Sequence, residues 1–94
     1  GVVFLSGDRH CTELSQVQLP NGRFVYDLTV SPLTSSSYDN TEEPNSHRVE
    51  GTVVGNRNYA LLDFSGPRKE RVLKMSVKTI ELFETVNLSV MTFR

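Results

Sequence analysis

Most of this chain alternates hydrophobic with polar positions, a pattern that predicts a protein built mainly of β-strands. The exception is the run VVFL at residues 2–5, which is apolar without alternation and is followed by Ser6 and Gly7. Such a run is typical of a strand that is buried on both faces of its sheet. Glycine ends the run because it lets the chain turn sharply and lets the backbone approach a ligand closely. We therefore expect a buried strand and a loop within residues 1–15.

Turn chemistry predicts a β-hairpin after this loop. The sequence PNG at residues 20–22 separates two stretches with a strand pattern, residues 16–19 and 24–30. Asn and Gly both accept positive φ, so this sequence favours a tight turn. The second stretch places four residues on one face: Phe24, Tyr26, Leu28 and Val30. Pro32 ends that stretch, because proline has no N–H to donate to a neighbouring strand.

Residues 33–48 form a long polar loop that contains one proline, several serines and charged residues. A loop of this length is uncommon in a small domain and is often functional or mobile. Two interpretations are open: a solvated excursion over the surface, or a lid that faces a substrate. His47 lies in this loop without another ligand at a metal-binding spacing, so we expect a surface histidine.

Three later stretches also have strand patterns. Residues 49–54 are expected to form a short strand bounded by Gly51 and Gly55, and residues 58–65 alternate between two faces. The alternation is clearest in residues 71–79, as expected of a half-exposed antiparallel strand. In that stretch we expect Leu73, Met75 and Val77 to face inward, and Lys74, Ser76 and Lys78 to face outward.

The last fifteen residues are compatible with two patterns. Apolar residues at even spacings and frequent β-branched residues in 80–94 favour strands. Residues 77, 80, 83 and 86 would equally form one short helical stripe. The predicted fold class is therefore mainly β, with α+β as the alternative. We expect residues 1–94 to be one unit, in which β-hairpins over residues 16–94 follow the strand and loop of residues 1–15.

Asp8 and His10 stand just beyond the first predicted strand, one residue apart. Open α/β sheets place ligands at this end of their strands, and an extended loop would point both side chains the same way. A carboxylate and a neutral imidazole are ordinary ligands for hydrolytic metal ions. Arg9 between them could offer a planar fork of donors to a phosphate oxygen. The alternative is that these are capping or surface residues, with Arg9 in a salt bridge.

The residues around this pair also resemble a known family. Residues 1–10 (GVVFLSGDRH) and 12–15 (TELS) resemble the last metal-site motif of alkaline phosphatase D-type (PhoD-like) metallophosphatases. The likeness continues, in the family's order, at residues 26–34 (YDLTVSPLT), 48–52 (RVEGT) and 57–64 (RNYALLDF). These segments span most of residues 1–75 and are far more specific than the Asp-x-His triplet. Cys11 stands where the family has an aromatic residue.

This resemblance implies the C-terminal part of a calcineurin-like metallophosphoesterase sandwich that hydrolyses phosphomonoesters or phosphodiesters. It implies that Asp8 and His10 ligate divalent or trivalent metal ions (Fe, Ca, Zn or Mn), with Arg9 as a further catalytic residue that contacts phosphate. The family's other ligand motifs lie upstream, and Gly7-Asp8 is the only Gly-Asp pair in this sequence. We therefore expect the missing N-terminal part of the same enzyme as partner, and an isolated chain that neither holds the metals nor is active.

The neighbours of this motif have simpler expected roles. Cys11 fits a small buried filler better than a soft metal ligand. Glu13 is expected to be exposed or to support the metal ligands from behind. Arg57 and Asn58 belong to the resemblance, but packing or loop bracing is their default role.

Composition excludes several classes of protein. The 94 residues carry a net charge of −1, and the basic residues form no stripe with aromatics, so we expect no nucleic-acid partner. No segment is long and apolar enough to span a membrane. The single cysteine excludes an internal disulfide and leaves the compartment open, although the resemblance implies a periplasmic or extracellular enzyme. The alternative function is a stand-alone β-rich binding or structural module without catalysis.

Overall fold

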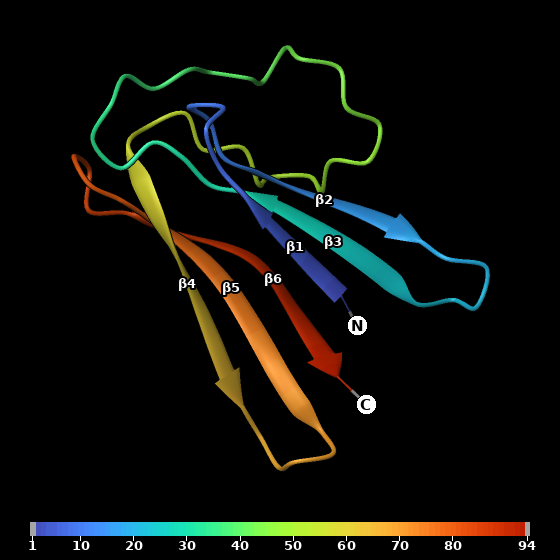
Figure 1. Ribbon diagram of the computed structural model, residues 1–94. Coiled ribbons are helices and arrows are strands. Elements are labelled where there is room, and N and C mark those ends of the chain that lie inside the picture. The colour runs from blue at the N-terminus through green and yellow to red at the C-terminus, as the bar shows by residue number, and fades with distance from the viewer. Residues whose placement is uncertain (1, 94) are drawn as a thin grey trace.

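A computed structural model describes residues 2–93, and its regular structure is entirely β (Figure 1). Within these residues there is no helix, and hence none that could cross a membrane. The prediction of a mainly β fold is confirmed. The strands are β1 (Val2–Ser6), β2 (Glu13–Gln18), β3 (Phe24–Thr29), β4 (Asn58–Ser65), β5 (Arg71–Thr79) and β6 (Thr85–Phe93).

The first sheet has the strand order β1-β3-β2. Strands β2 and β3 form the antiparallel hairpin expected from the turn chemistry, and Gly22 adopts the positive φ of 83° that the turn needs. The turn is closed by the Leu19 amide, which donates to the Arg23 carbonyl at 2.7 Å. Strand β1 pairs with β3 in parallel, from Val2 opposite Val25 to Ser6 opposite Thr29. The loop after β1 therefore lies at the same end of the sheet as the residues that follow β3.

The second sheet has the order β4-β5-β6, and all its pairs are antiparallel. The expected strands over residues 58–65 and 71–79 are confirmed, and the last stretch forms a strand rather than a helix. Met75 pairs with Ser89 and Ser76 pairs with Asn87, so Leu88 is an extra residue that forms a β-bulge. Ser76, opposite this bulge, is only 4% exposed, so the expectation that it faces outward is wrong.

One hydrophobic core joins the two sheets into a sandwich. The first sheet contributes Leu14, Tyr26 and Leu28, and the second contributes Leu73, Met75, Val77, Leu88 and Met91. Val54, from the long connection between the sheets, completes this cluster. Burying a leucine or methionine side chain fully contributes about 1.5–3 kcal/mol, so these residues account for much of the stability of the fold.

Strand β1 lies at the edge of the first sheet and is not buried. Val2, Phe4 and Leu5 are 50%, 60% and 63% exposed, and of this strand only Val3 packs against the core. The prediction of a strand is confirmed, but the prediction that it is buried on both faces is wrong for residues 2–93. The physical reason is that the core residues of the first sheet come from β2 and β3, so the second sheet does not cover β1.

The connection between the sheets arches over one end of the sandwich as the long loop in green and yellow (Figure 1). Its residues 33–48 contain no strand, as expected. The short strand expected over residues 49–54 is wrong, since only Val54 forms an isolated bridge, with Thr12. Gly51 has a φ of 77° and the Thr52 hydroxyl bonds the Val49 carbonyl at 2.6 Å, so a turn replaces the extended backbone here.

Candidate functional site

The turn after β1 carries an unusual backbone at both candidate ligands. Asp8 has a φ of 68° and His10 a φ of 62°, in the left-handed region that favours glycine. The Arg9 amide donates to the Gly7 carbonyl at 2.8 Å, which closes a γ-turn around Asp8. Each such residue costs about 1–3 kcal/mol and persists only where its surroundings hold it, and such residues cluster at functional sites. The turn is therefore a specific, strained feature of the fold.

Two hydrogen bonds hold the main chain of His10 in this conformation. Its amide donates to the Ser31 hydroxyl at 2.8 Å, and its carbonyl accepts from the Tyr38 amide at 2.7 Å. Ser31 follows β3, and Tyr38 belongs to the loop at 33–48. The turn is thus fixed by the segment that leaves the first sheet and by the long loop above it.

The side chains of Asp8 and His10 take no part in these main-chain hydrogen bonds. Within residues 2–93, neither the Asp8 carboxylate nor the His10 imidazole forms a hydrogen bond or an ion pair. Asp8 is exposed and His10 is half-buried. A strained backbone thus presents a carboxylate and an imidazole that have no polar partner in the described part of the chain.

Arg9 lies between them but is engaged elsewhere. Its Nη1 donates to Glu13 Oε1 at 3.1 Å, and its Nη2 pairs with Glu43. The hydrogen bond between Arg9 and Glu43 raises the pKa of Arg9 and lowers the pKa of Glu43. The structure thus places Arg9 in the salt-bridged arrangement that was the alternative to a phosphate contact. A phosphate would have to share the guanidinium with two carboxylates.

Glu13 is the buried centre of this ion-pair cluster, which comprises Arg9, Glu13, Glu43 and Arg48. Glu13 is 4% exposed, so exposure, the first of its two expected states, is wrong, and support of the metal ligands from behind stays a prediction. Its Oε2 accepts from Arg48 Nε at 2.7 Å, while its Oε1 accepts from Arg9. The sequence pattern did not identify Arg48 or Glu43. The only available signal was that Arg48 begins one of the segments that resemble the family.

The residues behind the turn brace it. Cys11 is completely buried, as expected of a filler, and this burial raises the pKa of its thiol. The Thr12 hydroxyl donates to Asn58 Oδ1 at 2.8 Å and also accepts from the Ser31 amide at 3.2 Å. Asn58 is 1% exposed, so its expected bracing role is confirmed, whereas Arg57 forms an exposed ion pair with Glu81 at 2.9 Å.

Asp8 and His10 have the donor chemistry of a metal site but are too few to complete one. Among residues 2–93, no group of three or more His, Cys, Asp or Glu side chains is placed to hold a metal ion. A hydrolytic centre needs several convergent ligands with support behind them. These two residues therefore fit a part of such a centre. His47 is exposed on the loop, as expected, and does not join them.

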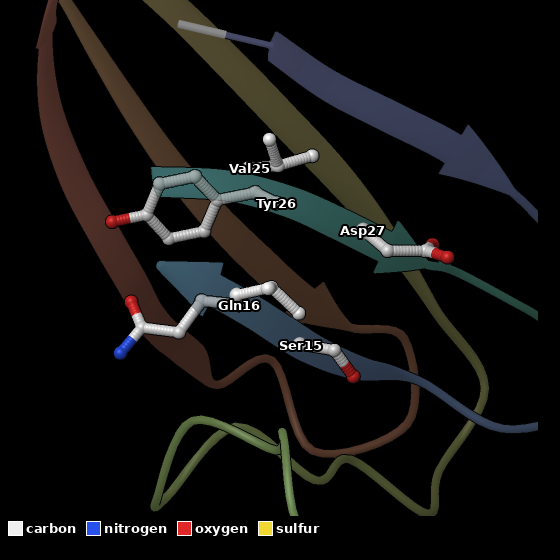
Figure 2. Close-up of a pocket in the computed structure, with 6 residues that line it drawn as sticks. Ser15, Gln16, Val25, Tyr26 and Asp27 are labelled. Carbon is white, nitrogen blue, oxygen red and sulfur yellow. The ribbon is translucent and has the colours of Figure 1, made fainter. Parts of the chain in front are cut away.

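A small hollow of about 80 Å³ lies away from this turn, along β2 and β3 (Figure 2). Figure 2 shows Gln16 and Tyr26 side by side on neighbouring strands, and these two residues are cross-strand partners. The lining also includes Ser15, Val17, Val25 and Asp27. Asp27 is the only carboxylate there, and no histidine or cysteine accompanies it, so the turn at residues 7–10 is the better candidate site.

Comparison of the chain with family models, with curated proteins and with solved structures finds no match. The function is therefore argued from the geometry of this turn and from the motif in which it lies.

Proposed function

We propose that this chain is the C-terminal portion of a PhoD-like, metal-dependent phosphomonoesterase or phosphodiesterase, in which residues 7–10 contribute the last metal-ligand motif. The observation that carries the proposal is the turn itself. Asp8 and His10 both have a strained left-handed backbone, and their side chains have no partner within residues 2–93. Residues kept only for capping would use their polar side-chain atoms, and within residues 2–93 these two do not.

The chemistry follows from the residue types. Bound metal ions would lower the pKa of a water molecule and neutralise charge on the phosphoryl group. His10 is the better-placed ligand because hydrogen bonds fix its backbone on both sides. Asp8 would act as a second ligand or orient a bound water. Arg9 would contribute to the electrostatic field at the site, and a direct contact with phosphate would require release from Glu13 or Glu43.

Strand β1 supports the proposal that the N-terminal part of the same enzyme is the partner. Parallel strands are normally covered on both faces, yet Val2 and Phe4 on one face and Leu5 on the other are largely exposed. One edge of β1 pairs with β3, and the other has no neighbour in the described sheet. Further strands at that edge and a covering layer would bury these side chains and could supply the remaining ligands.

The test is His10→Ala in the intact enzyme that contains this chain, with His47→Ala as the matched control. We expect H10A to lower the turnover of a chromogenic phosphate ester by about 100-fold or more while the melting temperature stays near that of wild type. H47A should behave like wild type, because His47 is exposed and lies outside the turn. Wild-type turnover in H10A would refute the proposal. Robust turnover by the isolated 94 residues would show that the site lies elsewhere.

A stand-alone β-rich binding or structural module is the second candidate. The observation that favours it is the core cluster, to which both sheets contribute side chains. The same activity assay on the intact protein separates the two candidates, because a module has no turnover for H10A to remove.

A further inference from the structure

The position of His10 depends on a loop that has no regular structure of its own. Tyr38, whose amide bonds the His10 carbonyl at 2.7 Å, lies within residues 33–48, where no strand is present. A loop without strands could not by itself hold a residue at a φ of 62°. Other contacts must therefore fix the loop.

The guanidinium of Arg48 donates hydrogen bonds to three main-chain carbonyls of the loop. Its Nη2 donates to the carbonyls of Asn40 at 2.9 Å and Glu43 at 3.0 Å, and its Nη1 donates to the carbonyl of Thr41 at 3.2 Å. These carbonyls belong to the residues just after Tyr38. One side chain thus closes the loop upon itself, next to the segment that touches His10.

The same guanidinium is anchored to the sandwich through Glu13. Arg48 Nε donates to Glu13 Oε2 at 2.7 Å, and the Glu13 side chain is only 5% exposed. Glu13 begins β2, where it pairs with Thr29 of β3, so its main chain is held by the sheet. Arg9, from the turn itself, binds Glu13 on one side and Glu43 of the loop on the other. The ion-pair cluster therefore connects the loop, the turn and the first sheet.

We propose that Arg48 and Glu13 are positioning residues. They keep loop 33–48 in place against the turn at residues 7–10, and thereby keep His10 in the conformation that binds metal. The inference rests on the proposed function for its effect on metal binding. Of the two interpretations of the loop, the contacts of Arg48 favour a fixed structural element over a moving lid. A lid would have to break the bonds from Arg48 to the Asn40, Thr41 and Glu43 carbonyls at each opening.

The geometry of the arginine provides the test. Arg48 uses Nε, Nη1 and Nη2 toward four acceptors, and a lysine has one nitrogen that cannot reach all of them. Arg48→Lys keeps the positive charge but removes the planar guanidinium, whose three nitrogens donate to several acceptors at once. The matched control is Arg71→Lys, since Arg71 makes one exposed hydrogen bond to the Gly66 carbonyl in a different hairpin.

The first measurement is amide hydrogen exchange of the chain by NMR, which requires no metal and no catalysis. In R48K we expect the Tyr38 amide to exchange roughly tenfold faster or more, as expected for loss of charge-assisted hydrogen bonds that hold the loop. The amides of β5 should keep their wild-type rates in R48K, and all of these rates should be unchanged in R71K. Equal protection of Tyr38 in wild type and R48K would overturn the proposal.

The second measurement is the binding of Co²⁺ to the intact enzyme, followed by its visible absorption spectrum. We expect R48K to weaken Co²⁺ binding by about 10–100-fold and to change the spectrum, while R71K does neither. A purely structural role for Arg48 would lower the melting temperature without altering the spectrum of the folded protein. If R48K does not fold, Glu13→Gln is the second variant, because it keeps the size of the side chain and weakens its contacts with Arg48 and Arg9. It should shift both readouts in the same direction.

The outcomes separate this inference from the proposed function. Loss of Co²⁺ binding in H10A together with wild-type exchange and spectrum in R48K, or in E13Q where R48K does not fold, would overturn the positioning role and leave the metal site standing. Wild-type Co²⁺ binding and turnover in H10A would refute the metal site, and with it the effect of Arg48 on that site.

Discussion

The stabilising effect of the Glu13 ion pairs can be isolated by Glu13→Gln, with Glu81→Gln as a control of the same chemistry. Both glutamates accept from an arginine Nε, at 2.7 Å from Arg48 and at 2.9 Å from Arg57. The two pairs differ in burial. The side chains of Glu13 and Arg48 are 5% and 16% exposed, whereas those of Glu81 and Arg57 are 49% and 47% exposed.

The magnitudes follow from this difference in burial. A hydrogen bond to a charged group in a buried setting contributes about 1.5–3 kcal/mol. The second partner of Glu13, Arg9, is 42% exposed, so that contact adds only about 0.2–1 kcal/mol. E13Q should therefore lower the free energy of unfolding by about 2–4 kcal/mol, whereas E81Q should lower it by about 0–1 kcal/mol. In a chain of this size, each kcal/mol shifts the melting temperature by about 4–8 °C.

The assay is chemical denaturation of wild type, E13Q and E81Q, repeated at low salt and at about 0.5 M salt, where the screening length falls to a few ångströms. The small effect of E81Q should vanish at high salt because that pair is exposed, and most of the effect of E13Q should persist because the pair is buried. A cost for E13Q no greater than that for E81Q would show that burial of Glu13 does not strengthen its ion pairs. The account of the ion-pair cluster as the anchor of the loop would then fail.

Two further predictions concern the turn and the buried thiol. Asp8→Gly should leave the stability of the chain unchanged or raise it by up to about 1 kcal/mol. The reason is that glycine relieves the strain of the left-handed backbone but adds entropy to the unfolded state. A loss of more than about 1 kcal/mol in thermal unfolding would mean that the carboxylate has a structural partner. Burial raises the pKa of Cys11 above its ordinary value, so between these two values the unfolded chain loses the thiol proton while the folded chain keeps it. The contribution of Cys11 is therefore complete below the ordinary thiol pKa and is lost as pH rises through the raised pKa. Cys11→Ala should reduce the fall in stability above that ordinary value, and identical pH profiles for wild type and C11A would contradict this prediction.

Part of the candidate site could be predicted from the sequence, because it depends on residues close together in the chain. The apolar run, the glycine and the Asp-x-His triplet identified the turn at residues 7–10. Arg48 and Glu43 could not be found in this way, since they meet Glu13 and Arg9 across more than thirty residues of chain. A salt bridge between such distant residues leaves no local pattern.

The sequence alone determined the elements whose signals are local. Alternation defined β4 and β5, and the Asn-Gly turn defined the hairpin of β2 and β3, because side-chain period and turn chemistry act within a few residues. Only the tertiary structure decided the burial of each face. Strand β1 has the composition of a buried strand but lies exposed at a sheet edge, and Ser76 is buried although the alternation of β5 predicts that it faces outward. Burial depends on which strands and sheets lie opposite a residue, and a linear sequence specifies these partners only through the completed packing.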